Sequence, residues 1–181
     1  MSSENLLETL VRRETIYTGK TLNVHKDIVT LPNGREAFRE IVEHRGSVVI
    51  VACNEDVVYF VRQYRHATGE ILLELAAGTM GANEDPADCA ARETAEELGL
   101  SPARLTLLCE GYVSPGYTSE LQRFFLAQDL SPATAECDDD EFIDVVQMPW
   151  HDALAALDRG EFRDSKTILG LLTAVRRLGI R

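Results

Sequence analysis

Short segments in which apolar residues alternate with polar ones, or form brief apolar runs, predict β-strands over much of the chain. Two of them, 21–31 and 35–43, flank the turn residues Pro32-Asn33-Gly34 and predict a β-hairpin. Two segments rich in β-branched residues predict strands over 47–53 and 57–65, and further strands are expected over 72–76, 104–113, 121–127 and 142–148.

Other segments predict helices. The first, Pro86–Leu98, follows Asp85, whose side chain can cap free N–H groups, and ends before Gly99, which suits the C-terminal cap. A second is expected over roughly 150–158, and a third after a cap at Ser165. The apolar residues of the third helix are expected to form one buried stripe: Ile168, Leu171, Leu172, Val175 and Leu178.

Strands with one central helix and terminal helices predict an α/β (α+β) fold, with a mixed sheet sandwiched between helices. Residues 1–43 are expected to add a small antiparallel sheet ahead of a main domain over 44–181. There are no internal repeats and no low-complexity segments.

The helix over 86–98 has two contrasting faces. Residues small enough to pack closely against a sheet share one face: Ala87, Ala91, Thr94, Ala95 and Leu98. Glu93, Glu96 and Glu97 lie together on another face, beside Arg92. Each like-charge pair at this spacing costs about 0.2–0.5 kcal/mol, so the cluster is either a solvated acidic surface or a site for a cation. Clustered carboxylates suit Mg²⁺ or Mn²⁺, which prefer oxygen ligands.

The spacing from Gly78 to Leu100 resembles the signature of the Nudix hydrolases, G-x5-E-x7-R-E-U-x-E-E-x-G-U, where U is a bulky aliphatic residue. The one departure is Thr94 at the first U position, which affects packing and leaves the chemistry intact. The resemblance implies a Nudix-type fold and hydrolysis of a nucleoside diphosphate linked to another group. Every charged residue and glycine of the signature matches: Gly78, Glu84, Arg92, Glu93, Glu96, Glu97 and Gly99.

Segments outside residues 78–100, called the box from here on, narrow the choice of substrate. Residues 114–120, Ser-Pro-Gly-Tyr-Thr-Ser-Glu, resemble the S-P-G-[FY]-[ST]-x-E segment of ADP-ribose pyrophosphatases, although Ser-Pro-Gly alone is a common turn. Residues 39–44, 61–65 and 164–168 resemble other segments of the same subfamily. The resemblance implies Mg²⁺-dependent hydrolysis of ADP-ribose to AMP and ribose 5-phosphate, with Mn²⁺ as a possible metal.

Two alternatives stay open. A pyrophosphatase of another nucleoside diphosphate sugar, such as GDP-mannose or a UDP-sugar, would share the box. A non-catalytic Nudix domain that senses ADP-ribose is the other alternative, but such domains commonly have a degenerate box, and this box keeps all its glutamates.

The resemblance also assigns roles to residues of the box. Glu93 and Glu97 are expected to be catalytic metal ligands, together with the carbonyl of Ala77, and Glu96 is a further ligand. Glu84 and Arg92 are expected to form an ion pair that supports the loop against the helix.

Residues outside the box complete the expected site. Glu141 is expected to be the general base, a metal ligand, or both, with Asp139 as the alternative base. Arg39 and Arg65 are expected to grip the diphosphate, because a guanidinium fork matches phosphate oxygens. Pro115, Gly116 and Glu120, in the loop after the box, are expected to bind substrate, with Glu120 near the terminal ribose. Glu74 is a candidate for a supporting residue. Tyr17 and Phe38 either stack on the base or belong to the core.

The composition limits the kinds of partner that the protein is expected to bind. The 181 residues carry a net charge of −12, which argues against nucleic acid as a partner and requires local cations wherever a diphosphate binds. No apolar run is long enough to span a bilayer, and the N-terminus lacks the features of a signal peptide. The four scattered cysteines indicate reduced thiols in a cytoplasmic protein. The family resemblance further suggests a homodimer in which the N-terminal sheet helps to complete the partner's pocket.

Overall fold

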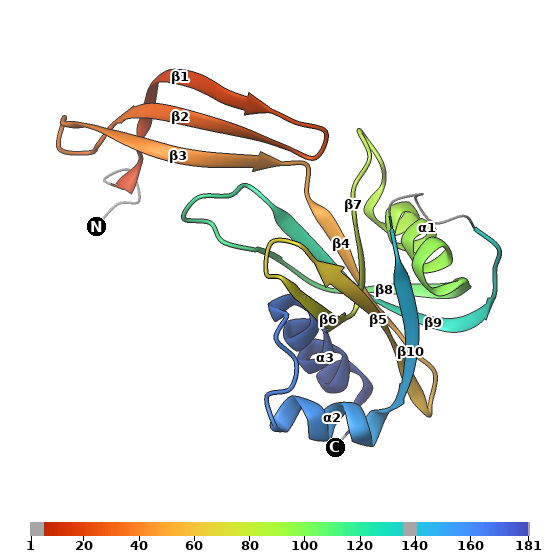
Figure 1. Cartoon of the computed structure of the whole chain (residues 1–181). Helices are drawn as coiled ribbons and strands as arrows, with labels where there is room; N and C mark the ends of the chain where they lie inside the picture. The colour runs from red at the N-terminus through yellow and green to blue at the C-terminus, as the bar shows by residue number, and fades with distance from the viewer. Residues whose placement is uncertain (1–5, 136–140, 181) are drawn as a thin grey trace. The chain divides into compact units, whose positions relative to one another are not determined.

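The structure is a computed structural model that describes residues 6–135 and 141–180 (Figure 1). The chain forms two compact units, one of Met1–Gly46 with Gly111–Leu121 and the other of Ser47–Glu110 with Gln122–Arg181.

The first unit contains an antiparallel sheet with the strand order β1-β2-β3. Its strands are β1 (Thr9–Thr18), β2 (Leu22–Thr30) and β3 (Glu36–His44). The hairpin predicted around Pro32-Asn33-Gly34 is confirmed, because Thr30 pairs with Glu36 and Gly34 has the positive φ of 82° that such a turn requires.

The hydrophobic pattern does not predict β1 as a separate strand. Every residue of β1 is exposed, and its pairing with β2 is interrupted between Leu10 and Arg12 and between Thr15 and Tyr17. A strand without a buried face carries no period-two signal, whereas β2 buries His25, Asp27 and Val29 at alternate positions.

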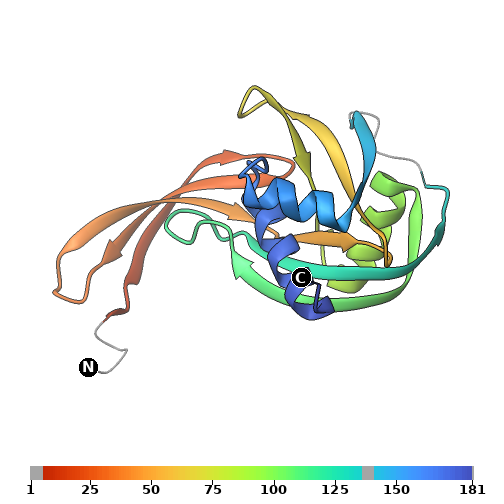
Figure 2. The same ribbon diagram turned by 90° about the horizontal axis from the view of Figure 1, so that it is seen from below.

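The second unit contains two sheets, with the strand orders β7-β4-β9-β8 and β10-β5-β6 (Figures 1 and 2). Strand β4 runs parallel to β9 and antiparallel to β7, so the predicted mixed sheet is confirmed. The strands are β4 (Ser47–Ala52), β5 (Val57–Arg65), β6 (Glu70–Glu74), β7 (Ala76–Thr79), β8 (Leu100–Tyr112), β9 (Leu121–Pro132) and β10 (Ile143–Pro149).

Strand β4 lies at the centre of the sandwich, and all six of its residues are buried. Val49 and Val51 belong to a core cluster shared with α2 (Trp150–Asp158) and α3 (Ser165–Leu178). Val48 and Ile50 belong to a second cluster shared with α1 (Pro86–Leu98). Helices therefore cover both faces of the sheet, as predicted (Figure 1).

The single strand predicted over 72–76 is in fact two strands. Residues Glu70–Glu74 pair with β5, and Ala76–Thr79 pair with β4 in the other sheet. The chain crosses between the sheets at Leu75, which is fully buried. The N–H of Leu75 donates to Thr167 Oγ1 at 2.8 Å, so this buried group is satisfied outside either ladder.

The helix boundaries largely follow the predictions, but two details were wrong. Asp164, and not Ser165, caps α3, because its side chain accepts from the N–H of Thr167. Leu172 is 49% exposed, while Gly170 and Ala174 take buried positions. For α1 the predicted cap at Asp85 and the left-handed Gly99 (φ 65°) are confirmed.

The buried face of α1 also differs from the prediction. Ala91 and Ala95 are only partly buried, whereas Cys89 and Ala90 are fully buried. The face against the sheet includes two carboxylates of the acidic cluster: the buried residues are Cys89, Ala90, Glu93, Thr94, Glu97 and Leu98.

Candidate active site

Helix α1 lies against β7 with almost no space between them. A Cβ added to Gly78 would lie 1.8 Å from Glu93 Cδ and 1.9 Å from Glu93 Oε1. Since real Cβ contacts are never that short, the Glu93 carboxyl occupies the space that any other residue at position 78 would fill. The glycine that opens the box is therefore required by packing, and it holds a carboxylate against the strand.

The second buried carboxylate, Glu97, lies one helical turn further along. Its Oε2 accepts a hydrogen bond of 3.1 Å from the N–H of Ala77, the residue before Gly78. Burial, with a smaller contribution from the charges of Glu93 and Glu141, raises the pKa of Glu97 to about 8, although this hydrogen bond opposes the shift. Burial likewise raises the pKa of Glu93 to about 7, although Arg92 opposes the shift.

Arg92 holds the acidic cluster together. Its Nε and Nη2 donate to the two oxygens of Glu84 at 2.9 and 3.1 Å, so the ion pair expected between these residues is present. Its Nη1 donates to Glu93 Oε1 and to Glu96 Oε2, both at 2.7 Å. The hydrogen bonds from Arg92 lower the pKa of Glu84 to about 2, and the N–H of Gly81 adds a bond of 2.6 Å.

The donor set fits a divalent cation. Glu93, Glu96 and Glu97 offer carboxylate oxygens. Burial raises the pKa of Glu93 and Glu97, and a bound cation would lower both pKa values again. In residues 6–135 and 141–180, no three His, Cys, Asp or Glu side chains already converge at metal-binding distance. Arg92 instead lies between Glu93 and Glu96, so a cation there would replace its guanidinium as their partner.

Glu141 precedes β10, and its charge raises the pKa of both Glu93 and Glu97. Coulomb effects of this kind fall off with distance, so Glu141 lies near both carboxylates. The structure thus brings this predicted base to the acidic face of α1. The alternative base, Asp139, lies outside the described residues.

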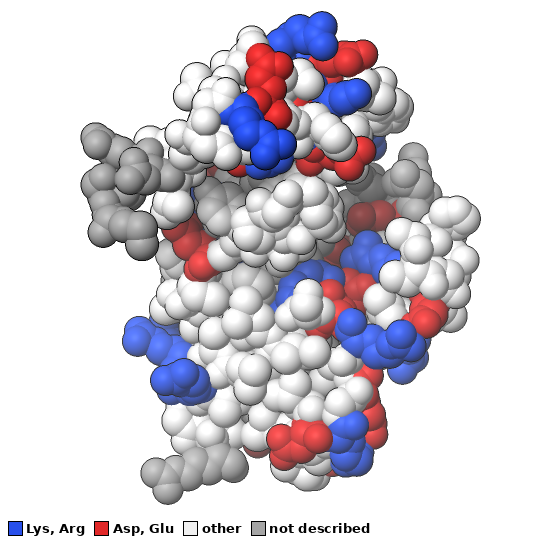
Figure 3. All heavy atoms as spheres, turned by 90° about the vertical axis from the view of Figure 1, so that its left-hand side faces the viewer, with Lys and Arg blue, Asp and Glu red and all other residues white. Residues whose placement is uncertain are grey.

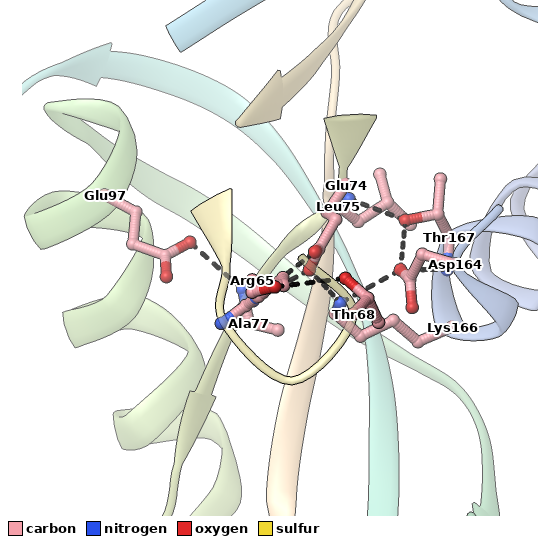
Figure 4. Close-up of polar contacts among 9 residues, drawn as sticks. All are labelled: Arg65, Thr68, Glu74, Leu75, Ala77, Glu97, Asp164, Lys166 and Thr167. Atoms are coloured by element: carbon pink, nitrogen blue, oxygen red, sulfur yellow. Dashed lines mark hydrogen bonds and ion pairs between the residues drawn. The ribbon is translucent and has the colours of Figure 1, made fainter. Parts of the chain in front are cut away.

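Arg65 lies beside the same site, but it already has an acidic partner. Its Nε and Nη2 donate to the oxygens of Glu74 at 2.8 and 2.7 Å, in a bidentate pair (Figure 4). Burial alone would raise the pKa of Glu74, but the hydrogen bonds from Arg65 and Lys166 outweigh burial and hold that pKa below its ordinary value. The Arg65 side chain is 39% exposed, so part of the guanidinium faces solvent.

Three residues at the start of α3 complete this network. Lys166 Nζ contacts Glu74 Oε2 and donates to Asp164 Oδ2 at 2.9 Å, and Thr167 Oγ1 donates to the same Asp164 oxygen at 2.6 Å. In the sequence, residues 164–168 stand out only as a segment that resembles the subfamily, with no role for its individual residues. No local signal in the sequence could have found the role of Lys166, because its partner Glu74 lies 92 positions away.

The remaining candidates lie in the first unit. Arg39, on β3, pairs with Glu8 through its Nε at 3.0 Å and also through its Nη2. The loop that holds Pro115 and Gly116 joins β3 by main-chain hydrogen bonds at Val42, and Glu120 follows it. The structure thus groups Arg39 with Pro115, Gly116 and Glu120, and separately groups the α1 carboxylates with Arg65 and Glu141.

Tyr17 and Phe38 are exposed by 57% and 59%, which excludes the alternative that they belong to the core. Basic and acidic side chains are intermixed on the face shown in Figure 3. None of the helices in the described ranges is both long and apolar enough to cross a bilayer. The three described cysteines, Cys53, Cys89 and Cys109, are free thiols.

The chain is similar to known proteins along most of its length. The family model of the NUDIX domain matches residues 43–170. The ADP-ribose pyrophosphatase of Bacillus subtilis is 35% identical over 167 residues, which cover 91% of this chain and 90% of that protein. A methanol dehydrogenase activator of Bacillus methanolicus is 34% identical over the same shares of both chains.

A relative that is named for a different substrate matches a smaller share of this chain. The GDP-mannose pyrophosphatase of Yersinia pestis is 34% identical over 146 residues, covering 74% of this chain and 73% of that protein. Among solved structures, one described as an ADP compounds hydrolase has a TM-score of 0.85 and 25% identity, with 96% of each chain covered. The predicted fold class is thereby confirmed.

The contact at Gly78 predicts the effect of Gly78→Ala. The added methyl group would displace the Glu93 carboxyl, which can swing away because it ends a flexible side chain. We expect the free energy of unfolding without metal to fall by about 1 kcal/mol, and the rise in Tm on adding Mg²⁺ to be lost. Gly111→Ala is the matched control, since a Cβ there meets nothing within 4 Å. A normal Mg²⁺ response in Gly78→Ala would contradict this packing argument.

Burial of Glu97 predicts an unusual pH dependence for the metal-free protein. Its pKa is raised to about 8 in the folded state, so its protonated form stabilises the fold at low pH, and this contribution is lost as the pH rises through about 8. Glu97→Gln keeps an acceptor for the N–H of Ala77 but cannot ionise. In EDTA, we expect the Tm of the variant minus that of wild type to become more positive between pH about 6 and about 9.

The control for this measurement is Glu110→Gln, which removes the same charge from a side chain that is 55% exposed. Its difference in Tm from wild type should change little over the same range. An equal response of both variants would mean that burial of Glu97 does not set its ionisation.

Proposed function

The chain belongs to the Nudix family of hydrolases, and from this premise we propose that it hydrolyses the diphosphate bond of ADP-ribose to AMP and ribose 5-phosphate. Enzymes of this family generally require divalent metal, and we propose Mg²⁺, with Mn²⁺ as a possible substitute. The observation that carries the proposal is the pair of carboxylates, Glu93 and Glu97, buried against β7 beside Arg65 and Glu141.

We assign the metal to the oxygens of Glu93, Glu96 and Glu97 with the carbonyl of Ala77. Bound there, Mg²⁺ would neutralise charge on the diphosphate and lower the pKa of the attacking water. Glu84 keeps Arg92 close to these carboxylates through its bidentate ion pair, which limits how far the guanidinium can move when the metal binds.

Chain residues supply the rest of the chemistry. Glu141 lies near both buried carboxylates and would accept the proton of the attacking water, in line with its position before β10. Arg65 would bind diphosphate oxygens through the N–H groups that Glu74 leaves unused. Arg39, the loop at Pro115 and Gly116, and Glu120 would contribute to recognition of the rest of the substrate.

The main alternative is another nucleoside diphosphate sugar, because a relative at 34% identity is named a GDP-mannose pyrophosphatase. The relatives named for ADP-ribose favour that substrate, since the one in Bacillus subtilis matches 91% of this chain and the GDP-mannose relative matches 74%. A sensing domain without catalysis is the weaker alternative, because the acids of the box are all present.

We also propose a cytoplasmic homodimer. The free thiols of Cys53, Cys89 and Cys109 fit a reducing compartment. Strand β1 is exposed on every residue and presents Leu10, Ile16 and Tyr17 to solvent, as an edge strand awaiting a partner would. Nucleic acid is not a proposed partner, given the net charge of −12.

The test of this function is a steady-state assay of a substrate panel. Purified protein with Mg²⁺ should give a higher kcat/KM for ADP-ribose than for GDP-mannose or a UDP-sugar, and EDTA should abolish turnover. A higher value for GDP-mannose would select the alternative enzyme. Binding of ADP-ribose without turnover of any substrate would select the sensing domain.

Within the same assay, Glu97→Gln should lower kcat at least about 100-fold, because it removes a charge from the proposed metal site. Glu110→Gln, with the same change in charge on an exposed side chain, should keep wild-type kcat. Activity of Glu97→Gln close to wild type would remove Glu97 from the metal site.

The proposed dimer predicts the mass in solution. Light scattering should give about twice the chain mass of 20.1 kDa. Replacing Ile16 by Lys places a charge on the exposed strand β1, and it should shift the mass towards that of one chain. A single-chain mass for wild type at assay concentration would contradict the proposal.

A further inference from the structure

The carboxylate of Glu74 is 1% exposed and lies between two cations. Arg65 holds both of its oxygens, and Lys166 Nζ contacts Oε2 from the other side (Figure 4). A buried carboxylate needs such partners to stay ionised, so its position depends on both of them. Any change at Lys166 therefore reaches Arg65 through the atom that they share.

Lys166 is itself held in place. It is the second residue of α3, and the cap residue Asp164 accepts from Lys166 Nζ at 2.9 Å and from the N–H of Thr167 at 3.0 Å. Thr167 Oγ1 accepts from the N–H of Leu75, the residue after Glu74. The start of α3 thus fixes both the side chain of Glu74 and the main chain that leads to Ala77 and Gly78.

Arg65 keeps unused donors and lies near a carboxylate of the proposed metal site. A guanidinium has five N–H donors, and Glu74 takes only two of them, which leaves three for phosphate oxygens. The charges of Arg65 and Glu97 affect each other, which places the two groups near one another. Figure 4 shows Ala77 and Arg65 between Glu97 on α1 and the α3 residues.

From this geometry we propose that Lys166 is a positioning residue: through Glu74 it sets the position and free charge of Arg65 for a diphosphate substrate. The proposal rests on the proposed function of the same site. With Lys166 present, Glu74 is shared between two cations and Arg65 keeps charge for the substrate. Without it, Arg65 becomes the main partner of a buried carboxylate, and its guanidinium is drawn away from phosphate oxygens.

The test compares Lys166→Met with wild type in the Mg²⁺-dependent assay with ADP-ribose. We expect kcat/KM to fall about 10- to 100-fold, as is typical when a residue supporting a binding group is removed. Lys166→Arg keeps a cation and should stay within about threefold of wild type. The Mg²⁺ concentration for half-maximal activity should not change, because no hydrogen bond or ion pair described for Lys166 reaches an α1 carboxylate.

The control variant is Arg163→Met, which removes a positive charge three residues away. Arg163 is 68% exposed and pairs with the exposed Glu70, so its loss should leave kcat/KM unchanged. A general effect of charge near α3 would lower activity in both variants, and that result would overturn the proposal.

The same substitution in the Glu74→Gln variant tests whether Lys166 acts through Glu74. In Glu74→Gln, which has no buried charge to share, adding Lys166→Met should lower kcat/KM by no more than about threefold. This pair also serves if Lys166→Met alone fails to fold, because the double variant contains no unpaired buried carboxylate. A Lys166→Met effect as large in this background as in wild type, or no effect in wild type, would overturn the proposal.

Calorimetric binding of ADP-ribose separates this inference from the proposed function. If wild type binds ADP-ribose without turnover, the hydrolase proposal fails, and weaker binding by Lys166→Met but not by Arg163→Met still supports the positioning role. If wild type neither binds nor hydrolyses ADP-ribose, GDP-mannose or a UDP-sugar, both proposals fail.

Discussion

The Glu93 carboxyl of α1 can lie against β7 only because residue 78 has no side chain, and the proposed chemistry of the site depends on this close approach. The Glu93 carboxyl fills the space beside Gly78, and Glu97 is bound by the N–H of Ala77. Each acid therefore loses contact with water, and burial raises its pKa. Packing that is unfavourable for ionised acids would become favourable once a cation shared their oxygens, so the close packing of α1 and the proposed affinity for metal would have the same origin.

The course of the chain could be predicted from the sequence to a large extent, because turns, caps and β-branched runs are local signals. The cap at Asp85, the left-handed Gly99 and the boundaries of α2 follow from a few neighbouring residues. The buried face of α1 could not be predicted in the same way, since the pattern assigns glutamates to solvent and alanines to the core. Here Glu93 and Glu97 are buried while Ala91 and Ala95 are partly exposed, and only contact with β7 decides this.

Long-range polar contacts were equally hidden from the sequence. The predicted strand 72–76 divides at Leu75 because its N–H is satisfied by Thr167, a residue on α3. Apart from Glu74, every residue from Ile71 to Ala77 is apolar, so the hydrophobic pattern does not mark the crossing. The role of Lys166 was hidden for the same reason, because its partner Glu74 lies 92 positions away in the sequence. Resemblance pointed to the segment 164–168, but a role for its lysine required the folded arrangement.

The residues proposed to take part in the reaction and in substrate binding belong to two different units. The acids of α1, Arg65 and Glu141 belong to the second unit, which also contains the whole box, so the proposed reaction would depend on one packed core. Arg39, Pro115, Gly116 and Glu120 belong to the first unit, where the loop 114–119 is bound to β3 at Val42. Relatives of this chain are named for ADP-ribose and for GDP-mannose, so similarity along most of the chain does not fix the substrate. In the proposed site, substrate choice would then depend on the first unit, and it could change while the proposed metal chemistry of α1 was preserved.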